Sequence, residues 1–387
     1  MPCSITYDAV FRPGGNPARQ NPFAPETDSP AMSAKPKHKT PVRVAIIGTG
    51  SMAHTHAAQF RGIKGCRLAA ACDINRKRAE AFAREFGIPK VFTRVDKLLE
   101  GAEFDAASIV TPDAQHAPAA LQCLRAGKHV LCEKPLATSY REALGMVAAA
   151  RRAGTVNMVN LSYRSWAALE GVAQAVRRGE VGDVRHVEAS YLQGWLLSST
   201  WGDWRRTPAL LWRLSTGHGS RGALGDLGVH LVDFATYLAG PITRVDCRLK
   251  AFSKAKGNRI GAYVLDANDS AVMVVEFANG AIGTMNTTRW CGGHENHLFL
   301  RIAGSKGTVE MDSDRSTTRY RICAGRDLDG GKWRERRGPP VADIYRRFIA
   351  AIRSGGKYAP DFARGAAVQK VLEACFVSDS RGAPAKV

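Results

Sequence analysis

Three polar side chains in one predicted helix have the types and the spacing of an acid–base site. The segment 223–239, ALGDLGVHLVDFATYLA, places Asp226, His230 and Asp233 at positions i, i+4 and i+7, which form one stripe on a helix. A carboxylate one turn from an imidazole can orient the ring and raise its basicity, as a general base requires. The pattern is unspecific, because a histidine paired with a surface aspartate has the same spacing. No further His or Cys stands here at ligand spacing, so we predict no metal.

A second chemical motif is the glycine turn in the segment 42–54, VRVAIIGTGSMAH. Its apolar, β-branched start is typical of a strand that is buried on both faces of a parallel sheet. The following residues fit the G-x-G-x-x-G/A pattern, in which the first glycine permits a tight turn and the second lets a pyrophosphate approach the backbone. The next helix would offer free N–H groups and a partial positive charge to the phosphates. The predicted cofactor contacts are Gly48, Thr49, Gly50, Ser51 and Met52.

An acidic residue completes the predicted dinucleotide site. A second apolar strand, 67–72, ends at Asp73, whose carboxylate can accept hydrogen bonds from the 2′-OH of an adenosine ribose. The same carboxylate would repel a 2′-phosphate, which favours NAD over NADP. Arg76, Lys77 and Arg78 lie close enough to leave NADP open.

The elements around these motifs predict an α/β chain with two kinds of sheet. Strands and helices alternate from residue 42 to about 160, the pattern of a doubly wound, Rossmann-type parallel sheet. From residue 184 onward, strands joined by tight turns such as Asn279-Gly280 predict an α+β domain with a mainly antiparallel sheet. Helices are expected at 76–86, 116–126, 139–153, 165–178, 343–353 and 363–380. Residues 1–40 lack periodicity and predict a disordered tail, and Met32 resembles a natural start of translation.

Composition excludes several other classes of protein. The formal net charge is +20, but the densest basic stretches, 315–321 and 326–337, are interrupted, so we interpret them as solvated surface and predict no nucleic-acid partner. No apolar run reaches the roughly 18 residues of a membrane helix, so we predict no membrane partner. The nine cysteines have no metal-ligand spacing and suit buried thiols in the cytoplasm.

Three separated motifs together resemble the Gfo/Idh/MocA oxidoreductases. They are the glycine turn, the stretch TPDAQHAPAALQCLRAGKHVLCEKPLA and the helix GALGDLGVHLVDF. The resemblance implies an NAD(P)-binding domain at 41–161, a substrate and oligomerisation domain with a large open sheet at 162–340, and C-terminal helices at 341–387 that pack back on the body. It also implies a homodimer or homotetramer formed through the open sheet. The implied reaction is hydride transfer between the nicotinamide and a hydroxyl or carbonyl group of a sugar, an inositol or a related polyol.

The resemblance also assigns roles to individual residues. It implies that Lys134 is the active-site lysine and that Asp226 and His230 complete the catalytic set. The cofactor would further contact Thr111, Pro112, His116, Glu133, Lys134 and Arg164, although Asp113 stands where the family usually has Asn. The substrate would contact Tyr163, Trp212 and Arg213 beside the catalytic set.

We expect Lys134 to be partly desolvated at the end of a core strand, which would lower its pKa and favour the neutral amine. Whether Lys134 or His230 is the immediate base stays open. Two other functions also stay open, namely a glycosidase that retains NAD and a non-catalytic NAD-binding regulator. The substrate is undefined: Trp195, Trp201, Trp204 and Trp212 suit either a sugar ring or a core, and Arg205, Arg206 and Arg213 leave room for an acidic sugar.

Overall fold

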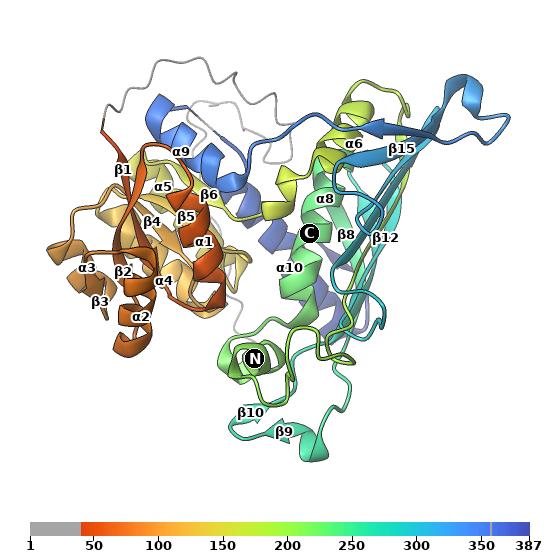
Figure 1. Cartoon of the computed structure of the whole chain (residues 1–387). Helices are drawn as coiled ribbons and strands as arrows, with labels where there is room; N and C mark the ends of the chain where they lie inside the picture. Colours follow the sequence, from red (N-terminus) through yellow and green to blue (C-terminus); the bar gives the residue numbers. More distant parts are fainter. Residues whose placement is uncertain (1–39, 357) are drawn as a thin grey trace, which may run out of the picture.

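The computed structural model describes residues 40–356 and 358–387. It has two layered parts, with a parallel sheet and its helices on one side and a large open sheet on the other (Figure 1). The predictions of a disordered tail over 1–40 and of a start at Met32 fall, apart from Thr40, outside the described residues.

The first part is a six-stranded sheet in which every neighbouring pair is parallel. The strand order β3-β2-β1-β4-β5-β6 is that of a dinucleotide-binding Rossmann fold, and it brings the carboxyl ends of all strands to one edge. The strands are β1 (Val42–Ile47), β2 (Cys66–Cys72), β3 (Val91–Phe92), β4 (Ala106–Ile109), β5 (His129–Cys132) and β6 (Asn157–Val159).

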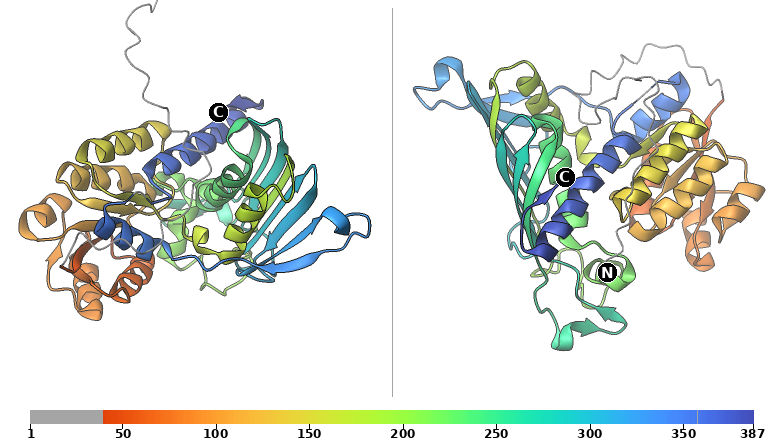
Figure 2. Two further views of the ribbon diagram at one scale, coloured as in Figure 1. Left: turned by 90° about the horizontal axis from the view of Figure 1, so that it is seen from above. Right: turned by 180° about the vertical axis from the view of Figure 1, so that it is seen from behind.

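Helices cover both faces of this sheet (Figures 1 and 2). They are α1 (Ser51–Arg61), α2 (Arg76–Phe86), α3 (Val95–Gly101), α4 (His116–Arg125) and α5 (Tyr140–Ala153). Their boundaries have local causes: Ser139 and Glu142 form a capping box at the start of α5, and the left-handed glycines Gly87 and Gly154 end α2 and α5.

The second part is a nine-stranded sheet of order β16-β15-β14-β13-β7-β12-β11-β8-β17. Only the pairing of β12 with β7 is parallel. The strands are β7 (Val184–Leu192), β8 (Ile242–Lys250), β11 (Ser270–Phe277), β12 (Ile282–Thr288), β13 (His297–Gly304), β14 (Gly307–Asp312), β15 (Arg319–Ala324), β16 (Arg334–Arg337) and β17 (Ala385–Lys386). The predicted fold class is therefore confirmed.

One face of the nine-stranded sheet is covered by α6 (Ala167–Arg177), α8 (Val229–Ala239) and α10 (Phe362–Arg381) (Figure 2). Side chains of β11 and β12 alternate between buried and exposed, so the opposite face meets solvent over these strands. The exposed side chains include Val272, Val274 and Ile282.

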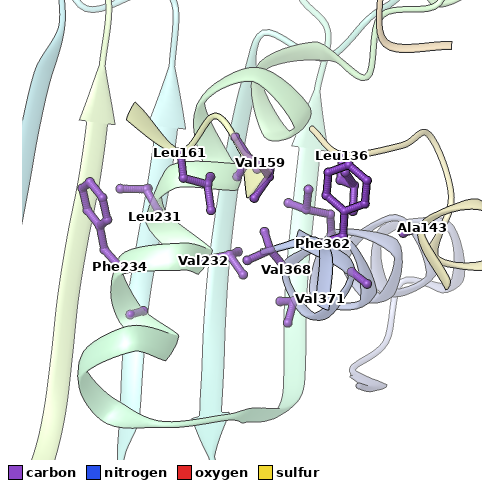
Figure 3. Close-up of a cluster of buried hydrophobic side chains, with 14 of the residues drawn as sticks. Leu136, Ala143, Val159, Leu161, Leu231, Val232, Phe234, Phe362, Val368 and Val371 are labelled. Atoms are coloured by element: carbon purple, nitrogen blue, oxygen red, sulfur yellow. The ribbon is translucent and has the colours of Figure 1, made fainter. Parts of the chain in front are cut away.

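A single apolar cluster joins the two parts and fixes their relative position. Phe362, Val368 and Val371 of α10 lie between Leu136 of the first part and Val232 of α8 (Figure 3). The contact is close, because a Cβ at Gly365 would lie 2.9 Å from Cδ2 of Leu136. The loop after β5 is thereby held against the helix that follows Asp226.

One element differs from the sequence predictions. The predicted helix 223–239 contains a π-helical turn, η5 (Leu224–Gly228), before α8 begins. The basic stretches include strands β15 and β16, and the ion pair between Arg319 and Glu335 across these strands is half-exposed, as expected of a solvated surface. No helix within the described ranges combines the length and the apolar character that a membrane span requires.

Candidate active site

The glycine turn has the space and the free donors that a pyrophosphate needs. Gly48 has a φ of +89°, and a Cβ there would lie 2.5 Å from the carbonyl oxygen of Val110. At Gly50 no described heavy atom comes within 4 Å of the position of a Cβ. No side chain caps the start of α1, which leaves its first N–H groups available to a ligand. The turn thus fits the predicted dinucleotide.

Asp73 is held in place beside this turn. Its Oδ2 accepts hydrogen bonds from Thr49 N at 2.8 Å and Thr49 Oγ1 at 3.0 Å, and its Oδ1 accepts one from Asn75 N at 2.8 Å. Arg78 Nη2 lies 2.7 Å from Oδ1. Burial opposes the charge of Asp73, but these hydrogen bonds, led by that of Arg78, lower its pKa. The carboxylate is therefore a fixed acceptor at the end of β2.

The predicted cofactor loop after β4 is tied to the loop that carries Lys134, the predicted active-site lysine. The ring of His116 lies between two carbonyl oxygens, Thr111 O at 2.9 Å and Pro135 O at 2.7 Å. Pro112 is exposed, whereas the Oγ1 of Thr111 is buried and has no hydrogen-bond partner in the described part of the chain. Burial raises the pKa of Asp113 in the same loop.

Glu133 points into the first part of the molecule. Its Oε1 lies 2.8 Å from His56 Nε2 and 2.5 Å from Asn160 Nδ2, and its Oε2 accepts a hydrogen bond from Lys134 N at 3.1 Å. Burial opposes its charge, but the bonds from His56 and Asn160 and the charge of Lys134 lower the pKa of Glu133 to about 2. This position supports an anchoring role for Glu133 and gives no support to the predicted cofactor contact.

Lys134 reaches from the first part of the molecule to the second. Its Nζ donates to Asp226 Oδ1 at 2.7 Å and to Asp226 O at 3.0 Å. Burial by itself lowers the pKa of Lys134, but the charges of Asp226 and Glu133 raise it above its ordinary value. The expectation that burial would favour the neutral amine is therefore wrong, because a charged partner is within contact distance.

Asp226 also binds a buried arginine that the sequence analysis missed. Arg289 Nη2 donates to Asp226 Oδ2 at 3.0 Å and Arg289 Nη1 donates to Arg213 O at 3.0 Å, and the Arg289 side chain is fully buried. Burial opposes the charge of Asp226, but Lys134, Arg289 and Arg213 keep its pKa well below the usual range. No local pattern marks Arg289, because its partner stands 63 residues earlier.

His230 lies in the same place but is not oriented by Asp226. Among the described residues its Nδ1 is buried without a hydrogen-bond partner, and both carboxylate oxygens of Asp226 are bonded elsewhere. The prediction that Asp226 orients the ring is wrong, since the π-helical turn changes the spacing on which it relied. Burial, followed by the charge of Lys134, lowers the pKa of His230 to about 3, so the imidazole is neutral.

Aromatic contacts hold the imidazole instead. The ring centroid of Tyr163 lies 4.5 Å from that of His230, which places this predicted substrate residue beside the catalytic set. Tyr163 OH lies 2.6 Å from Tyr191 OH, which donates in turn to Asn296 Oδ1 at 2.8 Å. Neither Tyr191 of β7 nor Asn296, which precedes β13, was predicted, because both are distant from His230 in the sequence.

Arg164 lies in the core. Its Nε and Nη2 donate to the two carboxylate oxygens of Asp233 at 2.6 and 2.8 Å, and Arg364 Nε donates to the same carboxylate at 2.7 Å. Burial by itself would raise the pKa of Asp233, but the charges and hydrogen bonds of both arginines outweigh it and lower that pKa to about 2. This position supports a structural role for Arg164 and gives no support to the predicted cofactor contact.

The predicted substrate residues Trp212 and Arg213 lie at the edge of the catalytic set. The guanidinium of Arg213 lies 4.8 Å from the ring centroid of Trp212, and Arg213 Nε lies 3.9 Å from Asp226 Oδ2. Trp195 and Trp204 are buried in a small separate core, which Trp201 borders. Of the four tryptophans considered for sugar stacking, Trp212 and Trp195 stand next to residues of the site, Trp195 with its ring centroid 5.3 Å from the guanidinium of Arg289.

Comparison with known proteins finds matches for most of the chain. A family model described as "Oxidoreductase family, NAD-binding Rossmann fold" matches residues 42–161, and one described as "GFO/IDH/MocA C-terminal domain" matches residues 169–310. The first match confirms the predicted NAD cofactor.

Curated relatives include levoglucosan dehydrogenase of Pseudarthrobacter phenanthrenivorans, 26% identical with 88% of this chain and 96% of the relative covered. Glucose-6-phosphate 3-dehydrogenase of Bacillus subtilis is 26% identical, with 89% and 98% covered. Among solved structures, levoglucosan dehydrogenase in complex with NADH and L-sorbose has a TM-score of 0.79 at 25% identity, covering 90% of this chain and 99% of that one. An oxidoreductase domain protein from Kribbella flavida has a TM-score of 0.78 at 29% identity, with the same coverage.

Proposed function

This chain belongs to the Gfo/Idh/MocA family of NAD-binding oxidoreductases, and we propose that it interconverts a secondary alcohol and a ketone on a sugar, an inositol or a related polyol. The contact between Lys134 Nζ and Asp226 Oδ1 carries this proposal, because it brings an ammonium group, a carboxylate and the neutral imidazole of His230 to one place. Curated relatives that bear the names of sugar and inositol dehydrogenases support the substrate class.

The glycine turn would hold the pyrophosphate of the dinucleotide through the free N–H groups at the start of α1. The carboxylate of Asp73 would accept hydrogen bonds from the ribose hydroxyls. Bound NAD supplies the hydride acceptor. Lys134 is the group that binds the substrate oxygen, since its ammonium can donate to an alkoxide or a carbonyl. Asp226, held by Arg289, keeps that ammonium charged and directed.

His230 takes the proton of the substrate hydroxyl in the oxidising direction. Of the two candidate bases, His230 has the free lone pair at neutral pH, whereas the raised pKa of Lys134 keeps it protonated. The low pKa of His230 makes it a weak base, but the ammonium of Lys134 offsets this by stabilising the alkoxide. The alcohol thus loses a hydride to NAD and a proton to His230, and the reverse direction returns both.

Residues 41–161 act as the dinucleotide-binding domain and 162–340 as the substrate and oligomerisation domain, with residues 341–387 packing back on both. The helix α9 (Ile344–Ser354) supports this division because its Tyr345 and Phe348 pack on Phe60 of α1. Helix α10 also packs back on the body, because its apolar side chains lie between α8 and the loop after β5.

The protein assembles as a homodimer or homotetramer through the open face of its nine-stranded sheet. Val272, Val274 and Ile282 support this, because these apolar side chains on adjacent strands are 56%, 52% and 54% exposed. The free thiols of the described cysteines, most of them buried, support the cytoplasm as the compartment.

A panel of sugars, inositols and sugar acids tests the function directly. Purified protein is incubated with NAD and each compound, and NADH formation is followed by absorbance. Net NADH from at least one polyol is the expected result. Cleavage of a chromogenic glycoside without net NADH would instead assign the glycosidase activity, and NADH binding without any turnover would assign a regulator.

A further inference from the structure

Two histidines and two aspartates gather at the start of β13 and the end of β14, outside the catalytic set. His294, His297 and Asp314 each offer a ligand atom, and these three atoms lie within 4.8 Å of one another. Asp312 stands behind them, with its Oδ1 3.0 Å from His297 Nε2. The spacing His294-x-x-His297 escaped the sequence analysis, which looked for ligands around the helix of Asp226.

His297 is arranged as a metal ligand. Because its Nε2 contacts the carboxylate of Asp312, that nitrogen carries the proton and the lone pair lies on Nδ1. This Nδ1 atom is buried and has no hydrogen-bond partner among the residues 40–356 and 358–387. A carboxylate that accepts a hydrogen bond from one ring nitrogen of a histidine fixes the ring so that the other nitrogen can bind a metal. The lone pair of His297 Nδ1 is therefore available to a metal ion.

His294 and Asp314 supply the other two ligands. His294 Nδ1 lies 2.8 Å from Asp314 Oδ2, and the rings of His294 and His297 are nearly parallel with centroids 4.5 Å apart. Two ordinary ion pairs, His294–Asp314 and His297–Asp312, would explain the short contacts. They leave the buried Nδ1 of His297 without a partner among the described residues.

The donor set defines the ion. Imidazole nitrogens suit Zn²⁺ and its neighbours in the first transition row, and a carboxylate oxygen completes a three-ligand site with a position for water. Metal–ligand distances of about 2.0–2.2 Å require ligand atoms roughly 3.4 Å apart in a tetrahedral site. Asp314, whose side chain is 48% exposed, can rotate to close the remaining gap.

We propose that His294, His297 and Asp314 bind a divalent transition-metal ion, Zn²⁺ in the first instance, with Asp312 orienting His297. The ion would tie the segment before β13 to the end of β14. That segment carries Asn296, which accepts hydrogen bonds from Tyr191 OH and Gln193 Nε2, both at 2.8 Å. The metal would thereby stiffen the support of the tyrosines that hold His230, a structural role independent of the proposed reaction.

Equilibrium dialysis of the untagged full-length protein against Zn²⁺ tests the site. One ion per chain is expected, with a Tm that rises on addition of Zn²⁺ and falls with EDTA. Asp314→Asn, a surface change, and the double variant His294→Ala/His297→Ala should each lose affinity at least about tenfold, and Asp312→Asn about 10–100-fold. The exposed His186 provides the matched control, since His186→Ala should bind like the wild type.

Co²⁺ substitution gives an answer that does not depend on the folding of any variant. Wild-type protein should show the visible bands of Co²⁺ bound by nitrogen and oxygen, without thiolate charge-transfer bands. Failure of the wild type to retain an ion, thiolate bands from a cysteine site, or wild-type affinity in Asp314→Asn would each overturn the proposal.

Discussion

Lys134 and Asp226 stand 92 positions apart in the chain, and Nζ of the lysine lies 2.7 Å from Oδ1 of the aspartate. The lysine lies two residues after Cys132, the last residue of β5, and the aspartate lies in the π-helical turn before α8. The two parts of the molecule therefore meet through a charged contact beside a neutral histidine. This contact keeps the lysine protonated and supports our proposal that the imidazole is the base.

His230 should make the stability of the protein depend on pH in a defined window. Its pKa is about 3 in the folded chain and 6.5 ordinarily, so between these values the unfolded chain binds a proton that the folded chain does not. Keeping His230 neutral therefore costs no stability above pH 6.5, and the free energy of unfolding falls as the pH drops from 6.5 toward 3. Chemical denaturation at pH 6.5 and 4.5 measures it.

The expected result is that the free-energy difference between wild type and His230→Gln changes by roughly 1–2 kcal/mol over that range. The exposed His186 serves as the control, and His186→Gln should keep the wild-type pH dependence. Equal pH dependence in wild type and His230→Gln would mean that the buried imidazole does not resist protonation.

Arg289 should act as a positioning residue through Asp226. In Arg289→Met the carboxylate of Asp226 keeps its contact with Lys134 but loses the hydrogen bond from a fully buried arginine. We therefore expect the free energy of unfolding to fall by about 3 kcal/mol. We also expect kcat/KM to fall while the Kd of NADH stays unchanged. Arg315→Met, which changes an exposed arginine, is the control. A double-mutant cycle with Asp226→Asn measures the coupling, and strictly additive effects would show that the two side chains do not act together.

Asp73 should govern the choice between NAD and NADP. In Asp73→Ser the carboxylate that would repel a 2′-phosphate is gone and Arg78, now released, can meet the phosphate. We expect the ratio of kcat/KM for NADP to that for NAD to rise at least about tenfold, or about 1.4 kcal/mol. Asp96→Ser removes a carboxylate from an exposed pair with Arg94 and should leave the ratio as it was. A ratio that stays constant in Asp73→Ser would place the ribose elsewhere.

The open face of the nine-stranded sheet should be the subunit interface. Val272→Lys/Ile282→Glu puts charges on two adjacent strands of that face, which would disfavour its burial against another copy. Light scattering after size-exclusion chromatography should find a monomer that still binds NADH. Val264→Lys, at a partly exposed valine of β10 (Tyr263–Val264), should remain an oligomer. An unchanged assembly in the double variant would exclude this face.

Local patterns predicted most elements, because their boundaries depend on nearby residues. Helix α2 begins and ends where the apolar spacing and Gly87 indicate, and β5 ends at Cys132, just before Glu133 and Lys134, as expected. The glycine turn and Asp73 also lie together at the carboxyl edge of the sheet.

The errors arise from an irregular turn within one helix and from a contact between distant residues. The spacing of Asp226 and His230 predicts an ordinary helix, but a wide turn forms there, and the side chain of Arg221 would lie 2.4 Å from a Cβ at Gly225. The pKa of Lys134 depends on a carboxylate in the other part of the molecule. The resemblance assigns Arg164 to the cofactor, and its buried ion pair with Asp233, 69 residues later, has no spacing that marks it in the sequence.

The central claim is that Lys134 acts on the substrate oxygen during hydride transfer, and Lys134→Met tests it most directly. With a polyol that the wild type oxidises, the variant should bind NADH with an unchanged Kd and reduce NAD at least about a hundredfold more slowly, while Lys64→Met, at an exposed lysine of the same domain, should match the wild type. Turnover of Lys134→Met within about threefold of the wild type would contradict the proposed site.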